Sequence, residues 1–193
     1  MKKSVLMFLG TAALFSLGGC GTSQSKPASS SSKASNKATT AKRVDFKPQT
    51  LPKVGVAEYT ITGISVGQVT NNKDNWTNAE YNFSGIKQFP KKYWRATISY
   101  QLKNVGTKPF DLSYQQATVI GGDNVEFTDS GSDRYGYDGN SNGLVQPGTA
   151  TTGKFILLSV DKPSLGTFKI NQSKQVASDG STELGAAGVT EYK

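Results

Sequence analysis

The sequence has no histidine and a single cysteine, Cys20. Without histidine, the chain lacks both the usual general base of Ser/His/Asp or Cys/His catalysis and the imidazole ligands of zinc and haem. A lone cysteine also cannot form an intrachain disulfide or a thiolate cluster. These absences exclude the commonest catalytic and metal-binding chemistries. We therefore predict no enzymatic activity, no catalytic residues and no resident cofactor.

Positive charge is concentrated at the start of the chain. The net charge is +8, and residues 1–53 carry all of it, with nine Lys or Arg against one acidic residue, Asp45. Residues 54–193 contain 13 basic and 13 acidic residues. A nucleic-acid-binding domain would need its basic patch on the folded part of the chain. The charge distribution therefore argues against nucleic acid as a partner.

The N-terminus has the features of a secretory signal peptide. Lys2 and Lys3 precede an apolar run over residues 5–17, which is followed by small residues and Cys20. The run of 13 residues is shorter than the roughly 20 needed to span a bilayer, which disfavours a transmembrane helix. The alternative is a plain signal peptide in which this cysteine is incidental.

The ending Leu17-Gly18-Gly19-Cys20 resembles the bacterial lipobox, in which the cysteine thiol is diacylglycerylated and the chain is cleaved before it. This resemblance implies a signal peptide over 1–19 and a mature lipoprotein that begins at Cys20. Acyl chains such as palmitate would hold it on the extracytoplasmic face of the cell membrane, because two chains anchor firmly where one is marginal.

Residues 20–53 are predicted to form a disordered tether, rich in Ser, Ala, Lys and Thr. The segment has few large apolar groups to offset the entropy of ordering it. Its basic residues could contact anionic lipid or a wall polymer. Alternatively, they only keep the tether soluble.

From residue 54 onward, the hydrophobic pattern changes to the two-residue period of half-buried strands. In residues 94–103, Trp94, Ala96, Ile98, Tyr100 and Leu102 fall on one face and polar residues on the other. Further strands are expected over 59–69, 110–112, 116–120, 125–128, 151–160 and 165–170. Since no 3.6-residue apolar stripe appears, we predict an all-β, immunoglobulin-like antiparallel sandwich over 54–193.

Two stretches carry a family resemblance. They are Lys103-Asn-Val-Gly-Thr-Lys-Pro-Phe-Asp-Leu112, and Leu144-Val-Gln-Pro-Gly148 followed by Gly153-Lys154-Phe155. Residues 56–170 resemble the telokin-like immunoglobulin domains of unknown function found in Gram-positive surface lipoproteins. The resemblance implies fold and location, and it supplies no catalytic residues. Its pieces also have local causes, because Pro147-Gly148 suits a type II turn and Gly153 is expected to mark a bulge.

The segment 123–143 is expected to be an acidic loop. Asp138, Asn140 and Asn142, with Gly143 after them, match the first six positions of a calcium loop. Thr149 stands where the closing bidentate Glu should be. We therefore weigh a calcium site against an ordinary solvated loop.

The same acidic loop raises a second alternative, a cell-envelope hydrolase that uses Asp129 or Asp133 with Glu126 as acid and base. Their spacing along the chain does not show whether these carboxylates face each other across a cleft.

Aromatic residues gather in the segment 71–93, which interrupts the resemblance to the family. Trp76 and Tyr81 are the most probable exposed rings in this segment, with Tyr135 and Tyr137 of the acidic loop as further candidates. Such rings either close the end of a small sandwich or recognise a protein or a glycan. Our interpretation is a lipid-anchored, non-enzymatic binding or accessory module, with a calcium-stabilised adhesion or inhibitor domain as another alternative.

Overall fold

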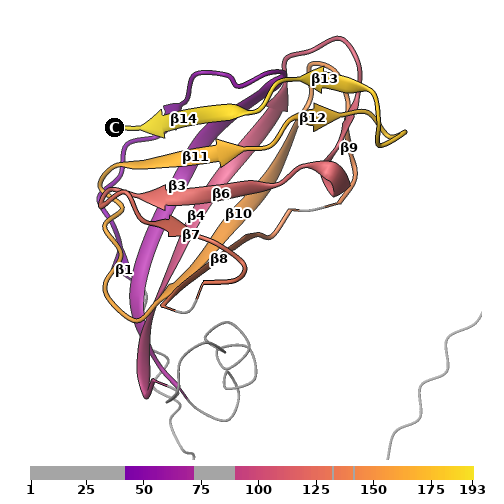
Figure 1. The fold of residues 1–193 in the computed structure, drawn as a ribbon. Coiled ribbons are helices and arrows are strands. Elements are labelled where there is room, and N and C mark those ends of the chain that lie inside the picture. Colours follow the sequence, from indigo (N-terminus) through magenta and orange to yellow (C-terminus); the bar gives the residue numbers. More distant parts are fainter. Residues whose placement is uncertain (1–41, 72–89, 132, 141) are drawn as a thin grey trace, which may run out of the picture. The chain divides into compact units, whose positions relative to one another are not determined.

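The computed structural model describes residues 42–71, 90–131, 133–140 and 142–193. The larger of its two main sheets has the strand order β1-β3-β4-β10-β8, and β2 also pairs with β3 (Figure 1). These strands are β1 (Lys42–Arg43), β2 (Gln49–Thr50), β3 (Ala57–Thr70), β4 (Lys92–Asn104), β8 (Arg134–Asp138) and β10 (Ala150–Ser159).

The smaller main sheet has the order β14-β11-β6-β7. It consists of β6 (Ala117–Gly121), β7 (Glu126–Phe127), β11 (Phe168–Gln172) and β14 (Gly188–Tyr192). Two further strand pairs are β5 (Phe110–Asp111) with β9 (Leu144–Val145), and β12 (Gln175–Val176) with β13 (Glu183–Gly185). A 3-10 turn, η1 (Leu112–Tyr114), follows β5.

The alternation in β4 explains how the larger sheet acquires two different faces. Ala96, Ile98, Tyr100 and Leu102 are at most 1% exposed, whereas Arg95, Gln101 and Lys103, which alternate with them in register, lie in solvent. Because successive side chains of a strand point to opposite faces, one face of β4 lies in the core and the other lies outside.

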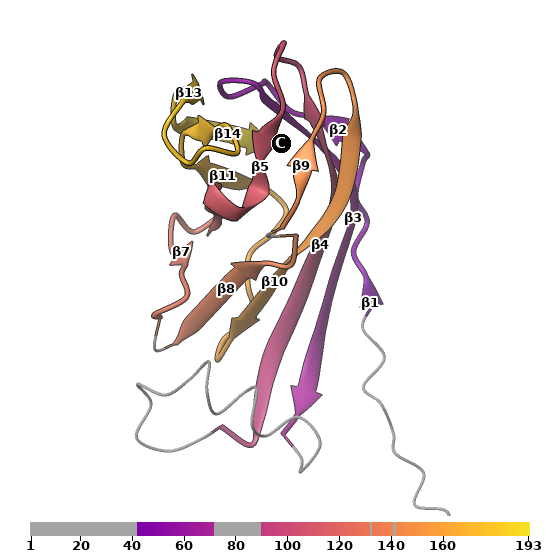
Figure 2. The same cartoon turned by 90° about the vertical axis from the view of Figure 1, so that its right-hand side faces the viewer.

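The core lies between the two main sheets. Tyr100 and Phe155 of the larger sheet belong to the same buried cluster as Phe127, Phe168 and Ile170 of the smaller sheet. The strands of the smaller sheet run across those of the larger one in Figure 1, and Figure 2 shows the two layers side by side. This arrangement confirms the predicted all-β antiparallel sandwich. In the part of the chain that the structure describes, no helix has the length and apolar character to cross a membrane.

The folded region begins earlier than the expected boundary at residue 54. The backbone N–H of Leu51 donates to the carbonyl of Tyr59 at 2.8 Å, and its side chain is 1% exposed. Val44 and Phe46 also pack against the core. The prediction of a tether that extends to Lys53 is therefore wrong for residues 42–53, because β1 and β2 pair with β3 and the apolar side chains of this segment pack against the core.

Two strands, β8 and β9, lie between the expected strands 125–128 and 151–160, where the sequence predicted none. β8 pairs with β10 at the edge of the larger sheet. Gly136 allows β7 to approach β8 closely, since a Cβ at this position would lie 2.6 Å from the Cβ of Phe127. The absence of aliphatic residues in β8 removed the usual signal of a strand.

The C-terminal residues after Asn171, which the family resemblance did not cover, complete the smaller sheet. β14 pairs with β11, and the ring of Tyr192 stacks on that of Phe168 with centroids 4.9 Å apart. The Tyr192 hydroxyl donates to the carbonyl of Lys47 and accepts from its backbone N–H, both at 3.1 Å. The last strand therefore fixes the segment through which the chain enters the fold.

Candidate functional site

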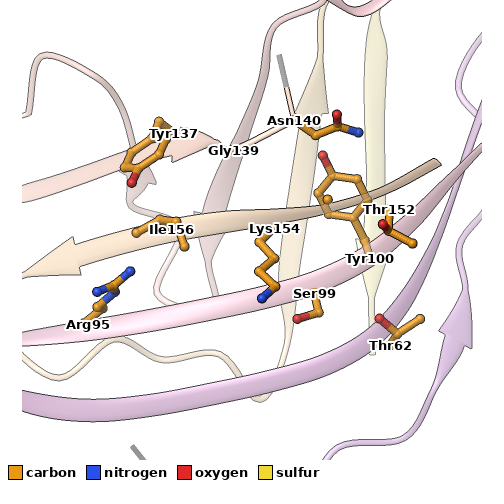
Figure 3. A pocket seen from close by; sticks show the side chains of 11 residues that line it. Thr62, Arg95, Ser99, Tyr100, Tyr137, Gly139, Asn140, Thr152, Lys154 and Ile156 are labelled. Carbon is orange, nitrogen blue, oxygen red and sulfur yellow. The ribbon is translucent and has the colours of Figure 1, made fainter. Parts of the chain in front are cut away.

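A cavity of about 590 Å³ opens on the outer face of the larger sheet (Figure 3). We call it the outer-face hollow. Four strands and the residues after β8 supply its lining, which consists of Thr62 from β3, Arg95, Ser99 and Tyr100 from β4, Thr152, Gly153, Lys154 and Ile156 from β10, Tyr137 from β8, and Gly139 and Asn140. The hollow is therefore assembled by strand pairing and not by one continuous loop.

The bottom of the hollow depends on the pairing of Tyr100 with Gly153. These two residues lie opposite each other in the β4–β10 ladder, and a Cβ at position 153 would lie 2.3 Å from the Tyr100 hydroxyl oxygen. The missing side chain lets the Tyr100 ring extend toward β8, where its hydroxyl donates to Asp138 Oδ1 at 2.5 Å.

Gly153 does not mark a bulge, as the sequence had suggested, because the β4–β10 register is continuous from Ala150 to Ser159. The register shift lies instead in β3, between Ile61 and Gly63. The extra residue there, Thr62, lies on the rim of the hollow. Bulges redirect side chains next to functional sites in many sheets.

Asp138 is the titratable group most affected by this arrangement. Burial raises its pKa to about 6. The hydrogen bonds from the Tyr100 hydroxyl and the backbone N–H of Asn140 act in the opposite direction and lower the pKa, but burial has the larger effect. Burial also raises the pKa of Tyr100, as do the neighbouring Tyr59 and Asp138. The Tyr59 ring lies 4.9 Å from that of Tyr100 in an edge-on contact, and its buried hydroxyl has no hydrogen-bond partner among the described residues.

The structure brings two of the predicted site residues, Tyr137 and Asn140, into the outer-face hollow. The Tyr137 side chain is exposed, and its ring lies 5.7 Å from that of Tyr135. Tyr135 packs with Tyr93 and Leu158 beside the hollow and does not line it. Cys20, Trp76 and Tyr81 lie outside the described residues.

Sequence reasoning missed the two cations of the hollow, Arg95 and Lys154. Both belong to alternating strands in which a charged residue on the outer face is unremarkable. Only the β4–β10 register, which places Lys154 opposite Ser99, shows that they share one cavity.

The predicted calcium ligands Asp138, Asn140 and Asn142 follow one another at the end of β8. Asp138 Oδ1 already accepts two hydrogen bonds, and Asn140 Nδ2 lies 3.5 Å from the hydroxyl of Thr151. Asn142 is exposed. No group of three or more acidic, His or Cys side chains within the described ranges could hold a metal ion. Asparagine side-chain oxygens can also bind calcium, so calcium binding at Asp138, Asn140 and Asn142 stays a prediction.

The acidic residues proposed for a hydrolase are distributed over different places. Asp129 lines a second cavity of about 300 Å³ together with Asp138, and this lining includes neither Glu126 nor Asp133. The Glu126 carboxylate accepts hydrogen bonds from the Thr118 hydroxyl and from Asn171 Nδ2.

One further acid of the predicted loop is paired with its only cation. Both guanidinium nitrogens of Arg134 donate to Asp123, at 3.0 and 2.5 Å. These hydrogen bonds lower the pKa of Asp123. The segment 123–143 is therefore partly neutralised and contains the strands β7 and β8, in contrast to the expected solvated loop.

Comparisons with known proteins return distant structural likenesses. No protein-family model matches the chain, and no curated protein matches it. A candidate lipoprotein, ycdA, from Bacillus subtilis subsp. subtilis str. 168 has a TM-score of 0.43 and 10% identity over 76% of this chain and 39% of its own. This chain thus spans well under half the length of that structure.

Two other solved structures are similar at the same low level. A functionally unknown protein from Listeria monocytogenes EGD-e has a TM-score of 0.41 and 12% identity over 69% of this chain and 76% of its own. The archaellum periplasmic stator protein FlaG from Sulfolobus acidocaldarius has a TM-score of 0.30 and 19% identity over 50% of this chain and 85% of its own. At these TM-scores the likenesses carry no information on function.

Proposed function

We propose that the protein is a non-enzymatic binding module, lipid-anchored at Cys20 on the extracytoplasmic face of a bacterial cell membrane, and that its partner binds in the outer-face hollow. The lipobox-like ending at Cys20 supports the anchor. The observation that carries the binding role is the hollow itself, whose volume of about 590 Å³ lies within the range of ligand-binding cavities.

The chemistry of the lining favours recognition over catalysis. Its side chains are cationic, hydroxyl, amide, aromatic and aliphatic, and none is a carboxylate, a thiol or an imidazole. The Asp138 carboxylate does not belong to the lining and is hydrogen-bonded to Tyr100. Such a set of groups can orient a bound molecule, but it lacks the acid and base pair that hydrolysis uses.

The second cavity gives the hydrolase alternative its specific support. Asp129 and Asp138 both line it, and burial raises the pKa of Asp138 to about 6. A carboxyl with a raised pKa can act as the general acid of glycoside hydrolysis opposite a second carboxylate, although this pair has Asp138 in place of the predicted Glu126. Turnover of cell-wall fragments by the purified protein, abolished by Asp129→Asn, would favour this alternative and contradict the binding role.

Crosslinking in intact cells tests the binding role directly. A photoreactive residue replaces Thr152, an exposed residue of the hollow, and a matched variant carries it at Val189, which is 54% exposed on β14 of the smaller sheet. We expect a defined adduct from position 152 and none from position 189. Absence of any adduct from 152, or equal labelling from both positions, would contradict the proposal.

A further inference from the structure

We infer that the outer-face hollow binds an anionic, hydroxyl-rich ligand, namely a saccharide or polyol chain that carries carboxylate or phosphate groups. This inference rests on the proposed function, because it names the class of ligand for the same site. Three properties of the described residues support it: the charge of the lining, the neutral donors around that charge, and the single exposed ring.

The charge of the lining is wholly positive. Arg95 and Lys154 are both exposed, and within the described part of the chain neither forms a salt bridge. Residues 54–193 have balanced charge, so this pair is a local feature and not part of a general basic surface. Unpaired cations next to a cavity attract a negatively charged group.

The separation of the two cations favours an extended ligand. Lys154 lies opposite Ser99 in the β4–β10 ladder, and Arg95 precedes Ser99 by four residues on β4. Four residues of a strand span about 13 Å. Cations whose backbone positions are this far apart suit a chain with repeated negative groups better than they suit a single small anion.

The neutral groups of the lining, which extend from Lys154 away from Arg95 (Figure 3), suit hydroxyls. Ser99, Thr62 and Thr152 contribute hydroxyl groups, and Asn140 contributes an amide. Each can donate and accept hydrogen bonds, which matches the mixed donors and acceptors of a sugar or polyol. Tyr137, which is 42% exposed, offers a ring face against which the apolar side of a sugar ring can pack.

Single-stranded nucleic acid is also an anionic chain, but the hollow fits it less well. Proteins that bind it stack successive bases on several exposed rings along a basic groove. Here Tyr137 offers one exposed ring, because the ring of Tyr100 is buried and Tyr135 packs beside the hollow. Nucleic acid is therefore an outcome that the experiment must exclude.

The experiment measures binding to the full mature chain in detergent by calorimetry. The probes are a galacturonic acid oligomer, a glycerol phosphate oligomer, maltotriose as the neutral control, and oligothymidylate. We expect one or both of the first two to bind, with the carboxylate and phosphate probes distinguishing the source of the negative charge. We expect no binding of maltotriose or oligothymidylate, and weaker binding at higher salt.

Variants locate the site. Lys154→Gln and Arg95→Gln should each weaken binding of the anionic oligomer about tenfold, the usual loss for one charged hydrogen bond. Lys103→Gln is the matched control, because Lys103 is exposed on the same strand and face as Arg95 but outside the hollow. It should leave the affinity unchanged, and all three variants should keep the unfolding midpoint of the parent protein.

Several results would overturn the inference. They are equal binding of maltotriose, tighter binding of oligothymidylate, or the same loss of affinity in Lys103→Gln as in Lys154→Gln. Failure of both anionic probes, with crosslinking from Thr152 intact, would overturn the ligand class and leave the binding role standing. Failure of both anionic probes together with the absence of a Thr152 adduct would overturn both the ligand class and the binding role.

Discussion

Asp138 should make the folded protein less stable at neutral pH than in mild acid. Burial raises its pKa from the ordinary 3.8 to about 6. One pKa unit corresponds to about 1.4 kcal/mol, so ionising this carboxyl in the folded state costs up to about 3 kcal/mol more than in the unfolded chain. This penalty is a substantial fraction of the free energy of unfolding of a small domain, which is about 5–15 kcal/mol.

The direction follows from proton binding in the two states. Below about pH 4, Asp138 is protonated in both the folded and the unfolded chain, so it adds no penalty. Between about pH 4 and 6, the unfolded chain releases the proton first, and the free energy of unfolding falls as the pH rises. Above about pH 6, the penalty has reached its full value and stays constant.

Asp138→Asn isolates this effect. The amide oxygen of the new side chain can still accept hydrogen bonds from the Tyr100 hydroxyl and from the backbone of Asn140, but it does not ionise. Urea unfolding of the parent and the variant between pH 4 and 8 gives the difference in their free energies of unfolding. We expect this difference to rise by up to about 3 kcal/mol in favour of the variant between pH 4 and 7.

A control removes general charge effects. Asp133→Asn removes one negative charge at an exposed position before β8, and its profile is subtracted from that of Asp138→Asn. The reasoning is refuted if Asp138→Asn gives a difference that is flat over this range, or one that falls as the pH rises.

Three other predictions concern the bottom of the hollow and the anchor. Tyr100→Phe removes a hydrogen bond that lowers the pKa of Asp138. It should lower the free energy of unfolding in urea by about 1.5–3 kcal/mol at pH 7 and move the pH range over which stability falls to higher pH. An unchanged dependence of stability on pH would contradict this. Gly153→Ala should cost about 1–3 kcal/mol because its Cβ would meet the Tyr100 hydroxyl, whereas Gly166→Ala, which has open space around its Cβ position, should cost far less; equal thermal unfolding midpoints would be evidence against the crowding. Cys20→Ala should release the protein from membranes during detergent-free washing, as followed by immunoblotting, and retention equal to that of the wild type would refute the lipid anchor.

The sequence pattern predicted those strands whose burial follows a strict alternation. β4 is the clearest, since every second residue from Ala96 to Leu102 is buried. Turn chemistry was also readable, because Gly148 has φ of +73° next to Pro147, as a type II turn requires.

The strands that the pattern missed depend on distant partners. The sequence of β8, Arg-Tyr-Gly-Tyr-Asp, contains no aliphatic residue, and β8 forms because β10 lies beside it. β14 is likewise tied to segments more than a hundred residues away, through the Tyr192–Lys47 hydrogen bonds and that between the backbone N–H of Lys193 and Gln49 of β2. Local composition carries no trace of such pairings.

The candidate site was predictable only in part for the same reason. Tyr137 was a candidate on account of its ring and its polar neighbours. The hollow beside it exists because strand register places Gly153 and Lys154 of β10 beside Tyr100 and Ser99 of β4, and a single sequence does not reveal register.

The contact between Tyr192 and Lys47 has a mechanical consequence for a protein held at its N-terminus. If the protein is anchored as proposed, tension between a membrane and a ligand in the hollow would reach the fold first at the β1–β3 pair and then pass along residues 44–53. The Lys47–Tyr192 hydrogen bonds and the short β2–β3 ladder would carry the load next. β14 thus links the entering segment to the smaller sheet. A pull on the chain would therefore be shared between both sheets and would not act only on the pairing of β1 and β2 with β3.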